Sequence, residues 1–152
     1  MSNAIFKLVK TNDSVMVTVL RLALGGVMFA HAAQKVLGWF GGYGISGTMG
    51  FFTHQLGIPT VLAALVIAAE FLGSLGLIFG ALTRVAALGV GAVMIGAVLT
   101  VHAKVGFFMN WGGQQGGEGY EYHILVLAMV AVLLVLGGGP FSVDRALARN
   151  AA

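Results

Sequence analysis

The stretch from Thr60 to Phe79 reads TVLAALVIAAEFLGSLGLIF, and it decides the fold class of the chain. A helix needs about 20 mainly apolar residues to cross the hydrocarbon core of a bilayer. This stretch has that length, and its single charged side chain, Glu70, lies near its middle. The pattern predicts a membrane-spanning helix that carries a carboxylate deep in the membrane.

Three further apolar stretches of similar length lie on either side of it: about Val15–Phe40, Val85–Val105 and Tyr120–Leu136. Of the 152 residues, 59% are hydrophobic and only 9% are charged. Soluble domains carry about 25% charged residues, so this chain has too little charge to cover a surface that faces water. We therefore expect an all-α integral membrane protein, an antiparallel four-helix bundle.

The four spans and their short connections form one expected domain, residues 14–138. A short interfacial segment (residues 1–13) precedes it and a C-terminal tail (residues 139–152) follows it. Lysine and arginine gather at cytoplasmic membrane ends, and here six lie at one end against two at the other. The six are Lys7, Lys10, Arg21, Arg84, Arg145 and Arg149, and the two are Lys35 and Lys104. We expect a protein of the bacterial inner membrane with both termini in the cytoplasm.

The composition also narrows the chemistry. The chain has no cysteine, so it cannot exchange thiols or hold a thiolate-bound metal by itself. Its formal charge of +3 is small and spread out, which gives no sign of nucleic-acid binding, and cations near anionic lipid explain it. We see no flavin, haem or metal motif. Any redox chemistry therefore needs a bound cofactor or a partner protein.

Glu70 is the first candidate site residue, because an ionised carboxylate at mid-membrane costs roughly 2.5–3.5 kcal/mol and normally has partners. Candidate partners on the other spans are His31, Gln34 and Lys35, then His102, then Glu121 and His123. At a rise of about 1.5 Å per residue, His31 and Glu70 lie at nearly equal depth on consecutive helices. We expect a polar pocket in the outer half of the bundle, with His31 and Glu70 in contact at its bottom.

Two Gly-rich segments, about Gly41–Pro59 and Gly106–Gly119, are expected to face the outside. They carry aromatic residues, Trp111 among them, and tryptophan prefers the membrane interface. The plain interpretation is a pair of loops anchored at that interface. The alternative is a flexible lid over the pocket, with Trp111 in contact with the ligand.

At the level of motifs the chain resembles the DoxX family. The similarity is carried by Phe29–Lys35 (FAHAAQK), Ala69–Gly73 (AEFLG), Gly80–Arg84 (GALTR), His102, Gly119–Tyr122 (GYEY) and Gly137–Asp144 (GGGPFSVD). The resemblance implies a small four-helix inner-membrane protein, in a family with ties to quinone-linked sulfur oxidation or to thiol and oxidative-stress systems. It marks His31, Lys35, Glu70, His102 and Glu121 as the characteristic polar positions. Ala32 stands where the family often has glycine, a change that leaves the helix intact.

Our leading hypothesis is a membrane component of a quinone- or thiol-linked redox system, such as a subunit of a quinone-linked oxidoreductase. A quinone-like ligand would occupy the outer-half pocket, and a redox partner protein would supply electrons. Glu70 and His31 are the expected catalytic residues, with Glu70 exchanging protons. The expected ligand-binding residues are Lys35, Gln34, His102, Glu121, His123 and Trp111.

Two alternatives stay open. In the first, the protein is a non-enzymatic scaffold or assembly subunit whose polar cluster only fixes the register of the helices. In the second, histidines 31, 102 and 123 with Glu70 or Glu121 bind a divalent metal or another small ligand. Their dispersed spacing gives no defined metal set. Small residues within the spans allow close helix packing, so a homo-oligomer is also possible.

Overall fold

The computed structural model describes residues 3–149, and within them the chain is all-α, without a β-strand. The long helices are α2 (Val15–Val36), α4 (Thr60–Phe79), α5 (Thr83–Thr100) and α6 (Glu121–Leu136). The short elements are α1 (Asn3–Val9), η1 (Trp39–Gly41), α3 (Gly44–Gly50), η2 (Phe51–Gln55), η3 (His102–Lys104) and α7 (Val143–Arg149). The predicted all-α class is confirmed. The outermost parts of the expected end segments, residues 1–2 and 150–152, lie outside the described residues.

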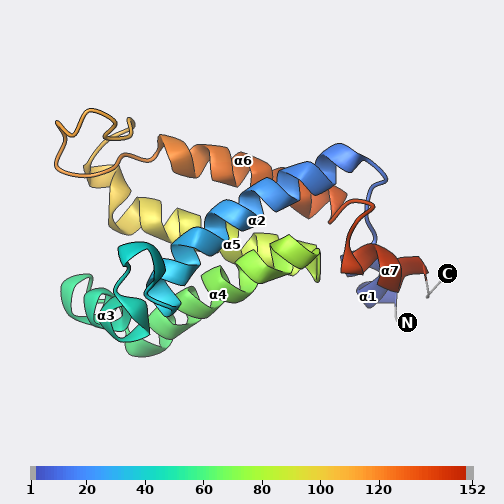
Figure 1. The fold of residues 1–152 in the computed structure, drawn as a ribbon, viewed down its shortest axis with the longest axis horizontal. Helices are drawn as coiled ribbons and strands as arrows, with labels where there is room; N and C mark the ends of the chain where they lie inside the picture. Colours follow the sequence, from blue (N-terminus) through green and yellow to red (C-terminus); the bar gives the residue numbers. More distant parts are fainter. Residues whose placement is uncertain (1–2, 150–152) are drawn as a thin grey trace.

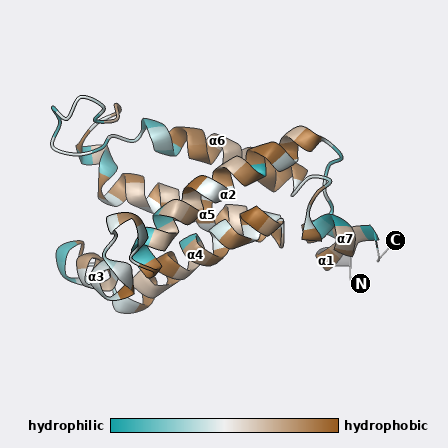
Figure 2. Cartoon of the chain, viewed as in Figure 1, coloured by the Kyte–Doolittle hydropathy of each residue, from teal (hydrophilic) through white to brown (hydrophobic). Residues whose placement is uncertain are grey.

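Within the described residues, three helices are long and apolar enough to cross a membrane: α2 with 22 residues, α4 with 20 and α5 with 18. Figure 2 shows the apolar colouring running along these helices, with the hydrophilic residues gathered near their ends. Helix α6 is apolar too but has only 16 residues, which gives a length of about 24 Å. Three of the four predicted spans are thus supported by length and composition, and the fourth stays a prediction.

The long helices pack in a closed order, because α2 contacts both α4 and α6, and α5 also contacts both α4 and α6 (Figure 1). Their shared core contains Leu24, Met28, Leu77, Val90 and Leu133, each at most 2% exposed. The outward faces are apolar as well, and large side chains such as Leu72, Leu88 and Leu125 are more than 60% exposed. An apolar exterior of this kind suits a hydrocarbon solvent rather than water.

We call the end of the bundle that holds both chain termini the terminal end, and the end that holds α3 and residues 106–119 the loop end (Figure 1). Arg21 belongs to the terminal end, and it is only 1% exposed. Its guanidinium group donates hydrogen bonds to the carbonyls of Gly138, Leu77, Ile78 and Phe141. This arginine, one of the six cations counted at the expected cytoplasmic end, is thus buried and joins three segments of the protein.

A second polar contact at the terminal end lies at the first residues of helix α5. Both carboxylate oxygens of Asp144 accept backbone hydrogen bonds, from Leu82 N at 2.7 Å and from Thr83 N at 2.8 Å. The first amides of a helix have no partner within the helix and carry partial positive charge. Asp144 therefore caps α5 from α7, which ties the C-terminal segment back onto the bundle.

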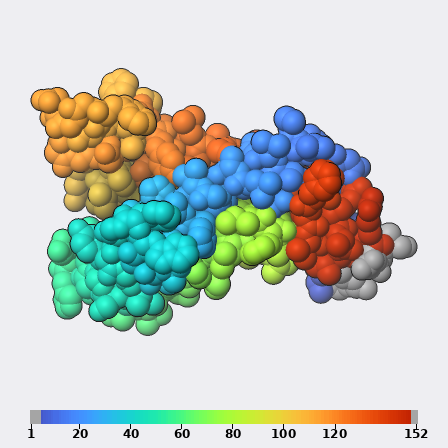
Figure 3. All heavy atoms as spheres, in the orientation of Figure 1, coloured from blue at the N-terminus to red at the C-terminus, as the bar shows by residue number. Residues whose placement is uncertain are grey.

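The loop end is more structured than expected. Residues Gly41–Pro59, predicted as an interfacial loop, contain α3 and the π-helical turn η2. Residues 106–119, by contrast, form an irregular loop as expected. Figure 3 shows these two segments as separate projections at the end of the molecule opposite the termini.

Two adjacent glycines in α2 provide a matched test of helix packing. A Cβ on Gly25 would lie 3.0 Å from the backbone nitrogen of Ile78 in α4, whereas one on Gly26 would meet no atom within 4 Å. We expect Gly25→Leu to lower the free energy of unfolding by about 1–3 kcal/mol, the usual cost of overpacking. Gly26→Leu, the control, should change it by less than about 0.5 kcal/mol. Unfolding in mixed micelles of increasing SDS content measures both, and equal effects would contradict this packing.

Candidate functional site

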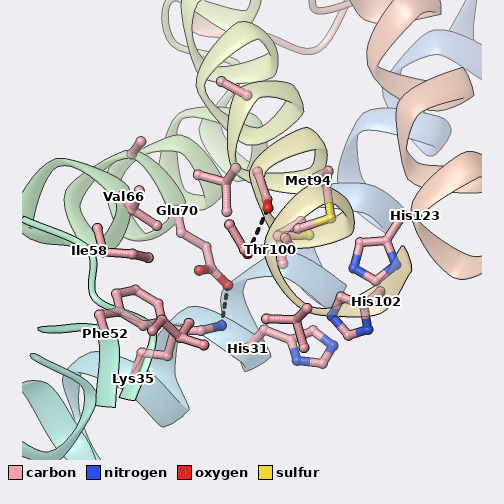
Figure 4. A pocket seen from close by; sticks show the side chains of 18 of the residues that line it. His31, Lys35, Phe52, Ile58, Val66, Glu70, Met94, Thr100, His102 and His123 are labelled. Carbon is pink, nitrogen blue, oxygen red and sulfur yellow. Dashed lines mark hydrogen bonds and ion pairs between the residues drawn. The ribbon is translucent and has the colours of Figure 1, made fainter. Parts of the chain in front are cut away.

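A cavity of about 730 Å³ lies among α2, α4, α5 and the start of α6, toward the loop end. Ligand pockets in proteins usually have about 300–1,000 Å³ and combine apolar walls with a few polar groups. The polar side chains of this cavity are His31, Lys35, Glu70, Thr100, His102, Glu118, Tyr122 and His123, and most of the remaining lining is aliphatic or aromatic. Figure 4 shows several of these side chains pointing toward one another. Five of the eight predicted site residues, His31, Lys35, Glu70, His102 and His123, line this cavity.

Glu70 and Lys35 form an ion pair on one side of the cavity. Lys35 Nζ lies 2.6 Å from Glu70 Oε1, and the side chains are 30% and 2% exposed (Figure 4). The buried carboxylate thus has a charged partner, as its cost of burial requires. We expected Glu70 to contact His31, but the structure pairs it with Lys35, one helical turn further along α2.

His31 lines the same cavity from α2. Its ring centroid is 6.1 Å from that of Tyr122 in α6, and the Tyr122 hydroxyl lies 3.7 Å from the sulfur of Met28. The imidazole is more than a third exposed to the cavity and its surroundings. It is therefore available to a ligand that also reaches the Lys35–Glu70 pair.

His102 and His123 form a second polar group on the opposite side, with ring centroids 4.2 Å apart (Figure 4). His102 Nδ1 lies 2.8 Å from the carbonyl oxygen of Glu118, and since a carbonyl only accepts, this nitrogen donates. His123 is 5% exposed, and its Nδ1 has no hydrogen-bond partner within residues 3–149. An unpaired buried polar atom is costly, so His123 is the side chain with most to gain from a polar ligand group.

The remaining predicted site residues do not line the cavity. Gln34 donates from Nε2 to the carbonyl of Phe40 at 3.4 Å. Glu121 Oε1 accepts from the Met109 amide at 3.0 Å and from Trp111 Nε1 at 3.3 Å. Glu121 and Trp111 therefore hold the loop of residues 106–119 in shape, and Gln34 packs against the segment that follows α2.

Sequence reasoning missed one wall of the cavity, which the segment after α3 forms with Phe51, Phe52, Leu56 and Ile58. It also missed Tyr122, which stands beside His31 and His123. The adjacent pair Phe51–Phe52 was visible in the sequence but did not by itself distinguish this segment, because the adjacent pair Phe107–Phe108 is exposed in the other loop. The glycines around Phe51–Phe52 had instead indicated a loop.

A metal site receives no support from the geometry. In the part of the chain that the structure describes, no group of three or more His, Cys, Asp or Glu side chains is placed to hold an ion. The paired imidazoles of His102 and His123 are two potential ligands, fewer than the three protein ligands that catalytic zinc sites use.

Comparison with known proteins identifies the family. The DoxX family model matches residues 16–103, more than half of the chain. The chain is 28% identical over 123 residues to "Putative oxidoreductase CatD" of Bacillus subtilis (strain 168), covering 81% of this chain and 79% of that protein. It is 29% identical over 127 residues to "Inner membrane protein YqjF" of Escherichia coli (strain K12), covering 80% and 92%. No solved structure matches it. The chain belongs to the DoxX family, which confirms the resemblance seen in its motifs.

Proposed function

We propose, from membership of the DoxX family as a premise, that this membrane protein is the membrane component of a quinone-linked redox system. It would bind the headgroup of a quinone in the cavity of about 730 Å³. We also propose that α6 crosses the bilayer as a fourth span antiparallel to α5, and that both termini face the cytoplasm. The excess of lysine and arginine at the terminal end supports this orientation.

The observation that carries the proposal is the combination of groups in one cavity. Its walls are mostly apolar, while the Lys35–Glu70 pair lies at one side and His102 and His123 lie at another, with His31 between them (Figure 4). A quinone head is a flat apolar ring with a carbonyl oxygen at each end, so it needs this distribution of walls and donors. The name of the Bacillus subtilis relative, which contains the word oxidoreductase, agrees with a redox role.

Each polar side chain then has a definite task. His31 and the Lys35 ammonium would donate hydrogen bonds to one carbonyl oxygen, and His123 would serve the oxygen at the other end. A bound quinone would supply the redox chemistry, because a quinone can take up two electrons and two protons. Glu70 would exchange protons with the ligand as the charge of the ligand changes on reduction. Electrons would come from a separate redox partner protein, because the sequence carries no flavin, haem or sulfur motif of its own.

A binding experiment tests the proposal. Purified protein in lipid nanodiscs should bind decylubiquinone saturably, as measured by equilibrium dialysis. We expect His31→Ala to weaken binding by about tenfold, the equivalent of one hydrogen bond of about 1.4 kcal/mol. His54→Ala is the matched control, because His54 is exposed in η2 and does not line the cavity. Absence of saturable binding to the wild-type protein would refute the proposal.

A scaffold function is the second candidate, and one observation favours it. The Lys35–Glu70 pair joins α2 to α4, and such a contact fixes helix register without any ligand. In that case Glu70→Ala would reduce the resistance of the protein to SDS, while neither decylubiquinone nor any other quinone would bind. Saturable quinone binding that depends on His31 excludes a purely structural role for the cavity.

A further inference from the structure

Helices α4 and α5 are in close contact over the half of their length near the terminal end. A Cβ on Gly76 would lie 2.9 Å from that of Ala86, and one on Gly73 would lie 3.2 Å from Cγ2 of Val90. Further toward the loop end, a Cβ on Gly89 would still be in ordinary contact with Ala69, at 3.6 Å. Small residues let membrane helices approach in this way, and they close the hairpin along this half.

The two helices diverge beyond that point. A Cβ on Gly96 of α5 would meet no atom within 4 Å, although Gly96 lines the cavity. Figure 1 shows α4 and α5 close together near their shared turn and well apart at the loop end. The cavity therefore extends into the space between these two helices.

The side chains that line this space are apolar, and some of them also reach the outer surface of the protein. Leu62 and Leu65 of α4 and Ala92 of α5 line the cavity, and the two leucines are also 50% and 60% exposed on the exterior. Both helices are candidate membrane spans, so their exposed apolar faces would meet lipid tails. Gly96 lies about 6 Å from the end of α5 at 1.5 Å per residue, so the opening would lie within the hydrocarbon region if α5 crosses the bilayer over its full length.

We infer that the ligand is an amphiphile, whose hydrocarbon tail leaves the cavity between α4 and α5 into the bilayer. This inference rests on the proposed function and makes it more specific: the substrate is a membrane-resident, tailed quinone. Its head lies against His31 and Lys35 of α2 and against Glu70 of α4. Its tail passes Ala92 and Gly96. A cavity with polar side chains at His31, Lys35 and Glu70 and an apolar opening between α4 and α5 matches the two ends of such a molecule.

The test compares two probes that share one headgroup. Decylubiquinone carries a ten-carbon tail on its ring. The second probe is the same ring without the tail, 2,3-dimethoxy-5-methyl-1,4-benzoquinone. Gly96→Trp places an indole in the opening, and Gly26→Trp is the matched control, because a Cβ on Gly26 also meets no atom within 4 Å and Gly26 does not line the cavity. We expect Gly96→Trp to weaken decylubiquinone binding by about tenfold. It should leave the tail-less quinone within about twofold, and Gly26→Trp should affect neither.

A second measurement does not depend on how well the variants fold. Decylubiquinone with a diazirine at the end of its tail, photolysed in the wild-type protein, should label α4 and α5 near Leu65 and Ala92, as read by peptide mass spectrometry. Equal loss of both probes in Gly96→Trp, no loss of either, or labelling confined to other helices would overturn the inference while leaving quinone binding intact. If neither probe binds the wild-type protein, the proposed function itself is wrong.

Discussion

Replacing Arg21 by methionine is expected to lower the free energy of unfolding by about 3–5 kcal/mol, among the largest effects that a single substitution has in a protein of this size. Arg21 donates to four backbone carbonyls. A hydrogen bond to a charged group contributes about 1.5–3 kcal/mol, and each acceptor left unpaired costs about 1–3 kcal/mol. Methionine keeps much of the apolar contact of the arginine stem but has no donor, so the loss is mainly that of the hydrogen bonds.

The position of those carbonyls explains why the loss affects the whole bundle. Leu77 and Ile78 lie in the last turn of α4, where carbonyls have no partner within the helix, and Gly138 and Phe141 lie between α6 and α7. Lysine cannot replace the guanidinium, because it is a point charge rather than a planar fork. Arg21→Lys should therefore recover only part of the stability.

Unfolding in mixed micelles of increasing SDS content measures the change for Arg21→Met and Arg21→Lys. Arg149→Met, at an exposed arginine in α7, is the control and should shift the free energy by less than about 0.5 kcal/mol. If Arg21→Met behaves like Arg149→Met, then Arg21 does not hold the terminal end together in the membrane.

The sequence predicted most of what depends on apolar periodicity and length. The stretches from Val15 and from Thr60 became α2 and α4 with the expected starts. Helices α2 and α5 ended earlier than predicted for local reasons. Helix α2 stops at Val36 because the backbone of Gly38 is left-handed, with φ of 72°, and α5 stops at Thr100 because the chain tightens into the 3₁₀ turn η3. A hydropathy pattern does not reveal either of these turns.

Helical geometry accounts for the different positions of Glu121 and His123, which were both predicted as ligand-binding residues. Two residues apart, they point in nearly opposite directions on a helix, so only one of them can face the cavity. In the structure His123 lines the cavity, whereas Glu121 accepts a hydrogen bond from the backbone amide of Met109 in the loop. Which of the two would face inward could not be derived, because it depends on the rotation of α6 about its axis.

The partner of Glu70 could not be chosen from the sequence. His31 and Lys35 occupy the same face of α2, one turn apart, and His31 was the better match in depth. The long, flexible lysine side chain spans the difference and brings a full charge to a buried carboxylate. Depth measured along the backbone therefore underestimates the reach of lysine. The segment from Phe51 to Ile58 was missed for another reason, since the glycines before it and Gly57 within it indicated a loop.

Glu70→Gln is expected to reduce quinone reduction by at least about a hundredfold, the contribution that a positioned proton donor or acceptor commonly makes. The glutamine amide oxygen can still accept from Lys35 Nζ, now 2.6 Å from Glu70 Oε1, so the contact between α2 and α4 should survive. An amide cannot exchange a proton with the ligand. Binding of decylubiquinone should therefore change by less than about twofold, because only the proton transfer is lost.

The measurement is quinol formation in native membranes in which the variant replaces the wild-type protein, with the soluble cell fraction supplying the redox partner. Asp13→Asn is the control, because it neutralises an exposed carboxylate paired with Arg145 at the terminal end and should leave turnover unchanged. Normal turnover in Glu70→Gln would remove the proton-exchange role from Glu70. Loss of quinone binding in step with turnover would instead make Glu70 a residue that holds the ligand, because in that case the carboxylate stabilises the bound quinone as much as it assists the reaction.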